Sequence, residues 1–324
     1  MLSYRTFCNT DPPVVTELWR SRAGQRGLLV PVSPDLFEQL VFAKLYFDYD
    51  GLIIARDDDR PLGDRPVGFI HAGFSSNEAG DGIYAELGVI CLVLVRPDCN
   101  EAEVAAGLLE RAEAYLCRRG ARMLYGGAVH PLNPFYLGLY GGSELPGVLD
   151  SDRLALELFA SHGYRQVDQT LVYHRQLSDF VSPIDRRQMQ IRRQMIVEMT
   201  ESPLTQNWWE ACTIGEFDLI RFELMPRNGG TVMASATFRT MEPAGSSAFS
   251  RATGLIDLSV DESVRRRGMA IFLMSEAFRQ FARQGIEIVE AQCGKSNEAA
   301  AGLYRKLGLQ PVGLGSVFCK PAEP

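Results

Sequence analysis

The stretch LIDLSVDESVRRRGMA, residues 255–270, passes from the pattern of a buried strand to that of a helix. Its apolar part ends at Val260, a polar loop follows, and Arg265-Arg266-Arg267-Gly268 lead into the helix. The first amides of a helix have no intrahelical partners and lie at the positive end of its dipole. Gly268 and Ala270 leave room for a phosphate group to reach those amides. The turn therefore predicts a diphosphate site; an ordinary strand-to-helix connection with solvated arginines is the alternative.

Strands and helices alternate on both sides of this turn. Strands are expected near 219–225, 231–238, 255–260 and 286–292, helices at 268–283 and 298–307, and a last strand to 319. Their order predicts an α/β fold with a mixed sheet.

The first half of the chain repeats the same order, which indicates a duplication. An offset of 165 residues relates Val95, Glu103 and Gly120 to Val260, Gly268 and Gly285, and an offset of 145 relates Gly163 to Gly308. The difference of 20 residues is an insertion in the loop 131–152. With 324 residues, the chain is expected to form two domains, 1–180 and 181–324, connected through 178–193. Two unrelated α/β domains are the alternative.

The composition argues against several classes of protein. A net charge of −7 gives no general attraction to nucleic acid or an anionic membrane, so we expect neither partner. The longest apolar run, Val89–Val95, is far shorter than the roughly 20 residues of a membrane span. Seven cysteines and four histidines are scattered without metal-ligand spacing, so we expect no metal and reduced thiols. The stretch MLSYRTFCNTDPPVV lacks a signal-peptide pattern, and we expect a cytoplasmic protein.

Two motifs resemble those of the GNAT superfamily of acyl-CoA N-acyltransferases. The turn matches the pattern R/Q-x-x-G-x-G/A, with Ala270 at the last position. The downstream pattern N-x-x-A-x-x-L-Y-x-x-x-G-F is matched by Asn297, Ala300, Leu303, Tyr304 and Gly308, with Leu309 in place of the aromatic residue. The resemblance implies two tandem GNAT-like units, each a mixed, mostly antiparallel twisted sheet flanked by helices with a splayed parallel strand pair. The tandem arrangement also resembles that of mycothiol synthase.

The resemblance further implies an acetyl-CoA or other acyl-CoA co-substrate and transfer of the acyl group, with acetyl favoured, to an amine of a small molecule or peptide. Attack would be direct, in a ternary complex, because no cysteine stands in the motif to act as a nucleophile. The coenzyme-binding residues that it implies are Leu258, Ser259, Val260, Arg265, Arg266, Arg267, Gly268, Met269, Ala270 and Asn297.

Tyr304 is implied as the general acid for the departing thiolate. A phenol of pKa about 10 is protonated at neutral pH and can donate that proton. Packing over the core is the alternative for Tyr304, and Asn297 is also expected to cap its helix. The base stays open between Asp257, on the strand before the turn, Glu290, on the neighbouring strand, and a chain of water molecules.

The first half departs from the pattern at each of these positions. Asn100, Glu103 and Ala105 replace Arg265, Gly268 and Ala270, while Asp152 and Phe159 replace Asn297 and Tyr304. A carboxylate repels a diphosphate and phenylalanine has no proton to donate, so the first coenzyme site is expected to be degenerate.

Three further interpretations stay open. The insertion Asn133–Gly147 is either a lid or acceptor-binding loop, or a loop that packs between the halves. Trp208-Trp209 are expected in the core rather than at the acceptor. The rival functions are a non-catalytic acyl-CoA-binding or sensing module and a protein-interaction platform built on the first half.

Overall fold

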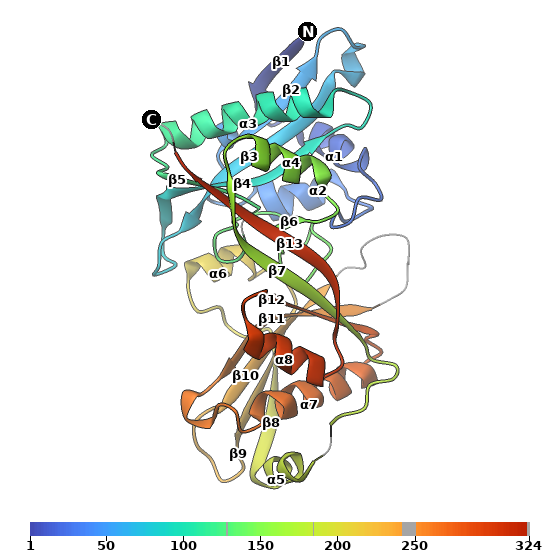
Figure 1. Cartoon of the computed structure of the whole chain (residues 1–324), viewed down its shortest axis with the longest axis vertical. Coiled ribbons are helices and arrows are strands. Elements are labelled where there is room, and N and C mark those ends of the chain that lie inside the picture. The colour runs from blue at the N-terminus through green and yellow to red at the C-terminus, as the bar shows by residue number, and fades with distance from the viewer. Residues whose placement is uncertain (128, 184, 242–250, 323–324) are drawn as a thin grey trace.

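The computed structural model describes residues 1–127, 129–183, 185–241 and 251–322 (Figure 1). The main elements of the first half are β1 (Leu2–Thr6), α1 (Pro12–Arg20), α2 (Pro34–Phe37), β2 (Leu52–Asp57), β3 (Pro66–Ser76), β4 (Ile83–Val95), α3 (Glu101–Arg118), β5 (Met123–Gly126), β6 (Val148–Leu149), α4 (Arg153–Ser161) and β7 (Arg165–Gln176). Those of the second half are α5 (Arg186–Gln194), β8 (Met195–Glu201), α6 (Trp208–Thr213), β9 (Leu219–Pro226), β10 (Ala234–Met241), β11 (Ala252–Val260), α7 (Met269–Arg283), β12 (Ile288–Gly294), α8 (Glu298–Lys306) and β13 (Gln310–Pro321).

Most expected elements are present, and two details differ. The connection 178–193, which follows the long strand β7, contains most of helix α5. Strand β8 was not anticipated, because its sequence Met195–Glu201 alternates weakly and all its residues but Met195 and Val197 are exposed. Edge strands need only one neighbour, so they carry the weakest sequence signal.

The duplication is visible in the bounds of the elements. Helix α4 and strand β7 reappear as α8 and β13 with both ends shifted by the offset of 145 residues. Strands β4 and β11 end at Val95 and Val260, and helices α3 and α7 end at Arg118 and Arg283, which keeps the offset of 165. The fold is therefore the expected tandem α/β arrangement with mixed pairing.

The two halves exchange their last strands within one sheet. In the described ranges the sheet has thirteen strands, in the order β1-β2-β3-β4-β5-β13-β7-β12-β11-β10-β9-β8, with β6 beside β13. Strand β7 of the first half pairs with β12, and β13 of the second half pairs with β5. The long strands β7 and β13 also pair with each other, from Gln310↔His174 to Cys319↔Arg165. Figure 1 shows them crossing at the middle of the molecule, with the C-terminus beside the first half.

Two parallel strand pairs, one in each half, are splayed. Strand β11 pairs with β12 only from Ala252 to Gly254, although it continues to Val260. Strand β4 likewise pairs with β5 only up to Ile90 and continues to Val95. Backbone groups of the last residues of β11 therefore face a gap on the β12 side.

Helix α7 holds the second half together. Phe272, Leu273, Ala277, Phe278 and Phe281 recur at a helical spacing and are all buried. They pack against β9, β10 and β11, and α8 covers the same cluster. This packing fixes where α7 begins, and hence where its free amides point.

The strand exchange predicts that the two halves unfold together. Removing either half would leave β7 or β13 without a neighbour, so partial unfolding exposes sheet edges on both sides. Differential scanning calorimetry should show one endotherm, with a ratio of calorimetric to van't Hoff enthalpy of about 1. Two resolved endotherms would contradict the exchange.

Candidate active site

The N-terminus of α7 is open at the turn predicted to bind a diphosphate. Gly268 is the N-cap, with a φ of 87°, and no side chain caps the helix. Arg266 also has a positive φ, of 63°, a conformation rare for residues other than glycine. A Cβ atom at Gly268 would lie 3.0 Å from Gln188 Nε2 and 3.1 Å from Arg187 Cδ. Glycine is therefore required here both by the backbone and by the close approach of α5.

A cleft of about 660 Å³ surrounds this turn. It brings together nine of the ten predicted coenzyme residues, namely Leu258, Ser259, Val260, Arg265, Arg266, Gly268, Met269, Ala270 and Asn297. Arg267 is exposed and does not line the cleft. Arg187 and Lys306 line it as well and add positive charge that sequence reasoning missed, because neither belongs to a motif.

Asn297 caps α8, and its side chain accepts a hydrogen bond from the amide of Ala300 at 3.0 Å. The expected capping role is confirmed. Because Asn297 also lines the cleft, its contact with the coenzyme stays a prediction.

Tyr304 lies in the core, is 3% exposed and does not line the cleft. Its hydroxyl donates to the backbone oxygen of Gln292 at 3.2 Å, and its ring packs edge-on against Tyr173 with centroids 5.3 Å apart. Burial raises the pKa of Tyr304, so the phenol stays protonated at neutral pH. The packing interpretation is therefore true of the ring, and the role of the hydroxyl as the acid stays a prediction.

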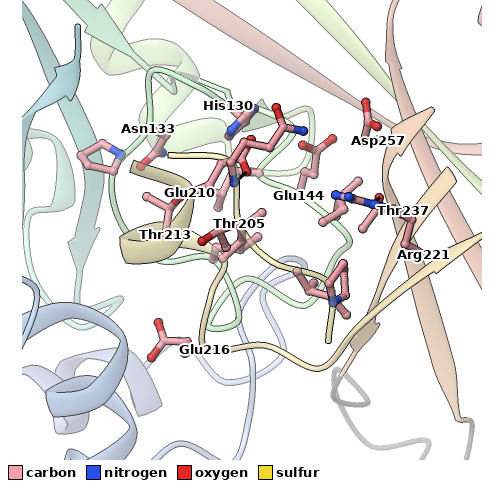
Figure 2. A pocket seen from close by; sticks show the side chains of 18 of the residues that line it. His130, Asn133, Glu144, Thr205, Glu210, Thr213, Glu216, Arg221, Thr237 and Asp257 are labelled. Carbon is pink, nitrogen blue, oxygen red and sulfur yellow. Dashed lines mark hydrogen bonds between the residues drawn. The ribbon is translucent and has the colours of Figure 1, made fainter. Parts of the chain in front are cut away.

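A second cavity of about 500 Å³ lies on the other side of the end of β11 (Figure 2). Ser259 lines both this cavity and the coenzyme cleft. Both halves of the chain contribute to its wall: Asn133, Phe135, Tyr136 and Glu144 come from the first half, and Glu210, Arg221, Thr237 and Asp257 from the second. The arrangement offers one side to a coenzyme and the other to an acceptor.

The two carboxylates that were considered as the general base, Asp257 and Glu290, lie in different environments. Asp257 lines the second cavity; burial raises its pKa, the Arg221 guanidinium opposes this, and the Glu210 carboxylate adds to it. Glu290 is 3% exposed and lines neither cavity. Burial alone would raise the pKa of Glu290, but hydrogen bonds from His174 and Ser143 outweigh it and the net shift is downward. Glu290 is thus held as a structural carboxylate.

The insertion Asn133–Gly147 fits both interpretations. Phe135 and Tyr136 are buried in a cluster with α1 and α2, where the Tyr136 hydroxyl lies 2.9 Å from His71 Nδ1. Other parts of the insertion line the second cavity. Trp209 is buried as expected, and its Nε1 donates to the oxygen of Pro131 at 3.2 Å.

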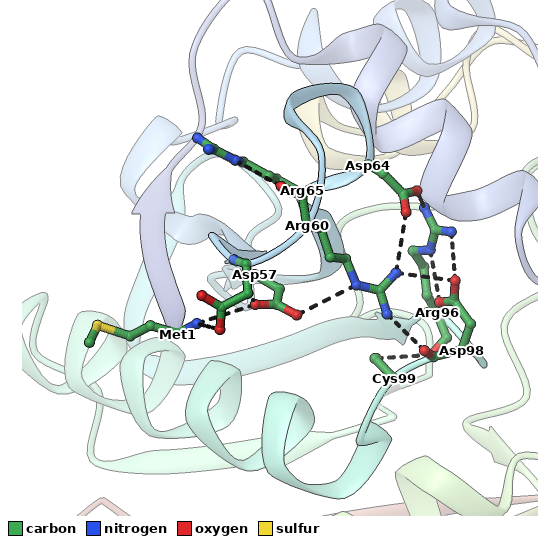
Figure 3. Close-up of polar contacts among 9 residues, drawn as sticks. Met1, Asp57, Arg60, Asp64, Arg65, Arg96, Asp98 and Cys99 are labelled. Atoms are coloured by element: carbon green, nitrogen blue, oxygen red, sulfur yellow. Dashed lines mark hydrogen bonds and ion pairs between the residues drawn. The ribbon is translucent and has the colours of Figure 1, made fainter.

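The corresponding site in the first half keeps a smaller cavity, of about 330 Å³, beside the end of β4 and Glu101. Asn100 caps α3, accepting from the amide of Glu103 at 3.5 Å and donating to its carboxylate at 3.0 Å. Arg22 forms an ion pair with Glu101 and donates to the oxygen of Val95 at 2.5 Å. Arg96 pairs with Asp64 and Asp98 (Figure 3). Polar groups around this cavity are thus engaged with one another.

Comparison with known proteins agrees with this geometry. Residues 188–309 match the acetyltransferase (GNAT) family model. A tandem GNAT protein from the clavulanic acid biosynthesis pathway is similar over 100% of this chain and 99% of its own, with a TM-score of 0.69 at 13% identity. A GCN5-related N-acetyltransferase from Sphaerobacter thermophilus is similar over 100% and 96%, with a TM-score of 0.63 at 17% identity.

A third solved structure contains a glucosamine N-acetyltransferase region of a fungal multi-domain β-N-acetylglucosaminidase. It is similar over 99% of this chain and 38% of its own, with a TM-score of 0.71 at 18% identity. No curated protein matches the sequence.

Residues 188–309 thus form a domain of the GNAT acetyltransferase family, and the whole chain has the tandem two-domain fold of GNAT proteins. Its second half is a domain of the acetyltransferase class. The more specific resemblance to mycothiol synthase stays a prediction. Within the described ranges, no helix is long and apolar enough to cross a membrane, and no three His, Cys, Asp or Glu side chains are grouped to hold a metal.

A matched pair of substitutions tests the diphosphate site. Gly268→Gln and Gly268→Glu carry the same left-handed strain and nearly the same volume, and only the second adds a negative charge beside the amides of α7. Calorimetry should show that Gly268→Glu binds CoA at least about tenfold more weakly than Gly268→Gln, which corresponds to about 1.4 kcal/mol. Equal affinities, with both proteins folded, would refute the assignment.

The carboxylates at the start of α3 predict one CoA per chain. Like charges about 4 Å apart cost roughly 4 kcal/mol at an effective dielectric of 20, whereas an exposed helix terminus returns about 0.3–1 kcal/mol. Glu101 and Glu103 should therefore exclude a diphosphate from α3. Titration of the intact chain with acetyl-CoA should saturate near one equivalent. A second equivalent, or a full equivalent bound by the Gly268→Glu chain, would show that the first site is active.

Proposed function

We propose that the protein transfers an acyl group, normally acetyl, from acyl-CoA to an amine of a small molecule or peptide. The observation that carries the proposal is the meeting of the coenzyme cleft and the second cavity at Ser259, beside the splayed end of β11. A thioester that lies along β11 from one side would reach an amine held on the other. Such a placement supports direct attack in a ternary complex, because it removes the need for a covalent enzyme intermediate.

Each part of the site would have a separate task. Amides at Arg266–Ala270 would bind the diphosphate of the coenzyme, and the edge of Leu258–Val260 that has separated from β12 would hold its pantetheine arm and acyl carbonyl. Tyr304 would donate its proton to the sulfur as the carbon–sulfur bond breaks. The raised pKa of Tyr304 keeps that proton available over the whole physiological range.

The second cavity would hold the acceptor. Its wall contains the carboxylates of Glu144, Glu210 and Asp257, against the guanidinium of Arg221 and the ammonium of Lys44, which is paired with Glu216. The excess of negative charge favours an amine that arrives as a cation. All seven cysteines are free, which fits a reducing compartment, and we propose that the enzyme works in the cytoplasm.

The proposal is tested by turnover of acetyl-CoA across a panel of amines, with thiol release and product mass as readouts. For any amine that is acetylated, Tyr304→Phe should lower kcat by roughly 10²–10⁴ with little change in CoA affinity, because it removes only the acidic hydroxyl. A variant within threefold of wild type in single-turnover rate would assign Tyr304 to packing alone. A protein that binds CoA yet acetylates no amine would be the sensing module instead.

A further inference from the structure

A short segment of the first half, Gly142–Leu145 (the strap), is hydrogen-bonded to strands of the second half beside the candidate active site. The Nε of Arg239 on β10 donates to the oxygen of Ser143 at 2.7 Å, and the same guanidinium donates to the oxygen of Gly142. The amide and hydroxyl of Ser143 donate to Glu290 on β12 at 2.6 Å and 2.9 Å.

The next residue of the strap is held in the same way. Gln292 on β12 donates from Nε2 to the backbone oxygen of Glu144 at 2.8 Å. Ser143 is 0% exposed, and Arg239 and Glu290 are 3% exposed each. A buried charged group that loses its hydrogen-bond partners is strongly destabilised, so these contacts hold the strap in one position.

A glycine on β11 of the second half leaves the space that the strap occupies. A Cβ atom at Gly254 would lie 2.3 Å from the Cβ of Ser143, so only glycine allows the strap to lie against β11. Gly254 is the last residue of β11 that pairs with β12. The strap therefore enters where the two strands separate.

This anchorage places the side chain of Glu144 in the acceptor cavity, among the side chains shown in Figure 2. Charged and titratable groups face it from every element around it: Arg239 on β10, Asp257 on β11, Glu290 on β12 and Tyr304 on α8. The Glu144 charge is close enough to Tyr304 to contribute to the raised pKa of the phenol, after burial and Cys293. Glu144 thus lines the cavity proposed for the acceptor and is within electrostatic range of the proposed acid.

We propose that Glu144, supplied by the first half, takes a proton from the acceptor ammonium in the active site of the second half. This inference rests on the proposed function. The neutral amine then forms the nitrogen–carbon bond, the electron pair of the carbon–sulfur bond leaves with sulfur, and sulfur takes the proton of Tyr304. The second proton lost by the nitrogen restores the Tyr304 phenol, and Glu144 releases its proton to solvent.

The electrostatic environment of Glu144 suits this role. Burial raises the pKa of Glu144 to about 7; Arg239 opposes the rise, while Asp257 and Glu290 add to it. A base is most effective when its pKa lies near the working pH, since it is then both ionised and able to hold the proton. Below pH 7 Glu144 is protonated and unable to accept, so the rate should rise as pH increases through about 7.

The test compares kcat/KM against pH for the intact chain and three variants. Glu144→Gln should lower the rate by roughly 10²–10³ and remove the ionisation near pH 7, and Glu144→Asp should restore part of both. Asp150→Asn removes an exposed carboxylate from the same loop and should match wild type. CoA affinity and melting temperature, measured in parallel, show that each variant is folded.

A second measurement separates proton transfer from binding. The acceptor found in the amine panel is compared with its oxyamine analogue, whose nitrogen is already neutral at pH 7. If Glu144 removes a proton from the ammonium, the Glu144→Gln defect should shrink at least tenfold with the analogue. An equal defect with both acceptors, or an unchanged pH profile in Glu144→Gln, would overturn the inference while leaving acyl transfer by wild type intact.

Discussion

The separation of two parallel strands is the feature on which the site depends. Strands β11 and β12 pair only from Ala252 to Gly254, and β11 then continues to Val260 paired with β10 on its other side. Because the polar backbone groups of a strand must find partners, we expect the edge of β11 that has separated from β12 to bind an extended ligand. The same separation admits the strap from the first half at Gly254. One departure from regular pairing therefore provides both a coenzyme surface and an anchor for the acceptor side.

The second level of organisation is the exchange of β7 and β13. Each strand completes the sheet of the other half, so neither half is closed by its own sequence. The exchange also fixes the distance between the insertion and β12, because β7 is the immediate neighbour of β12. Without that fixed distance, the hydrogen bonds of Ser143 to Glu290 would not form in one geometry. We expect no coenzyme chemistry in the first half, yet its strap contacts Arg239 and Glu290 of the second half.

Features that depend on a short stretch of sequence could be predicted. Short motifs indicated the turn at Gly268 and the cap at Asn297, and constant offsets indicated the duplication. The structure has all three where they were expected. The strand exchange was missed because a strand's pattern shows that it is buried but not which strand lies beside it. Glu144 was missed for a related reason: it lies in an insertion with no counterpart in the second half, so no motif marks it.

The predicted degeneration of the first coenzyme site rests on several residues. Replacing Glu103 with glycine would still leave the Asn100 side chain on the α3 amides, and such a cap is worth about 1 kcal/mol. It would also leave Arg22 bonded to the oxygen of Val95, and Phe159 at the position where the second half has Tyr304. The strap contacts, in contrast, join residues of both halves. If the second half carries the chemistry as we propose, the first half is therefore a structural component of a single active site.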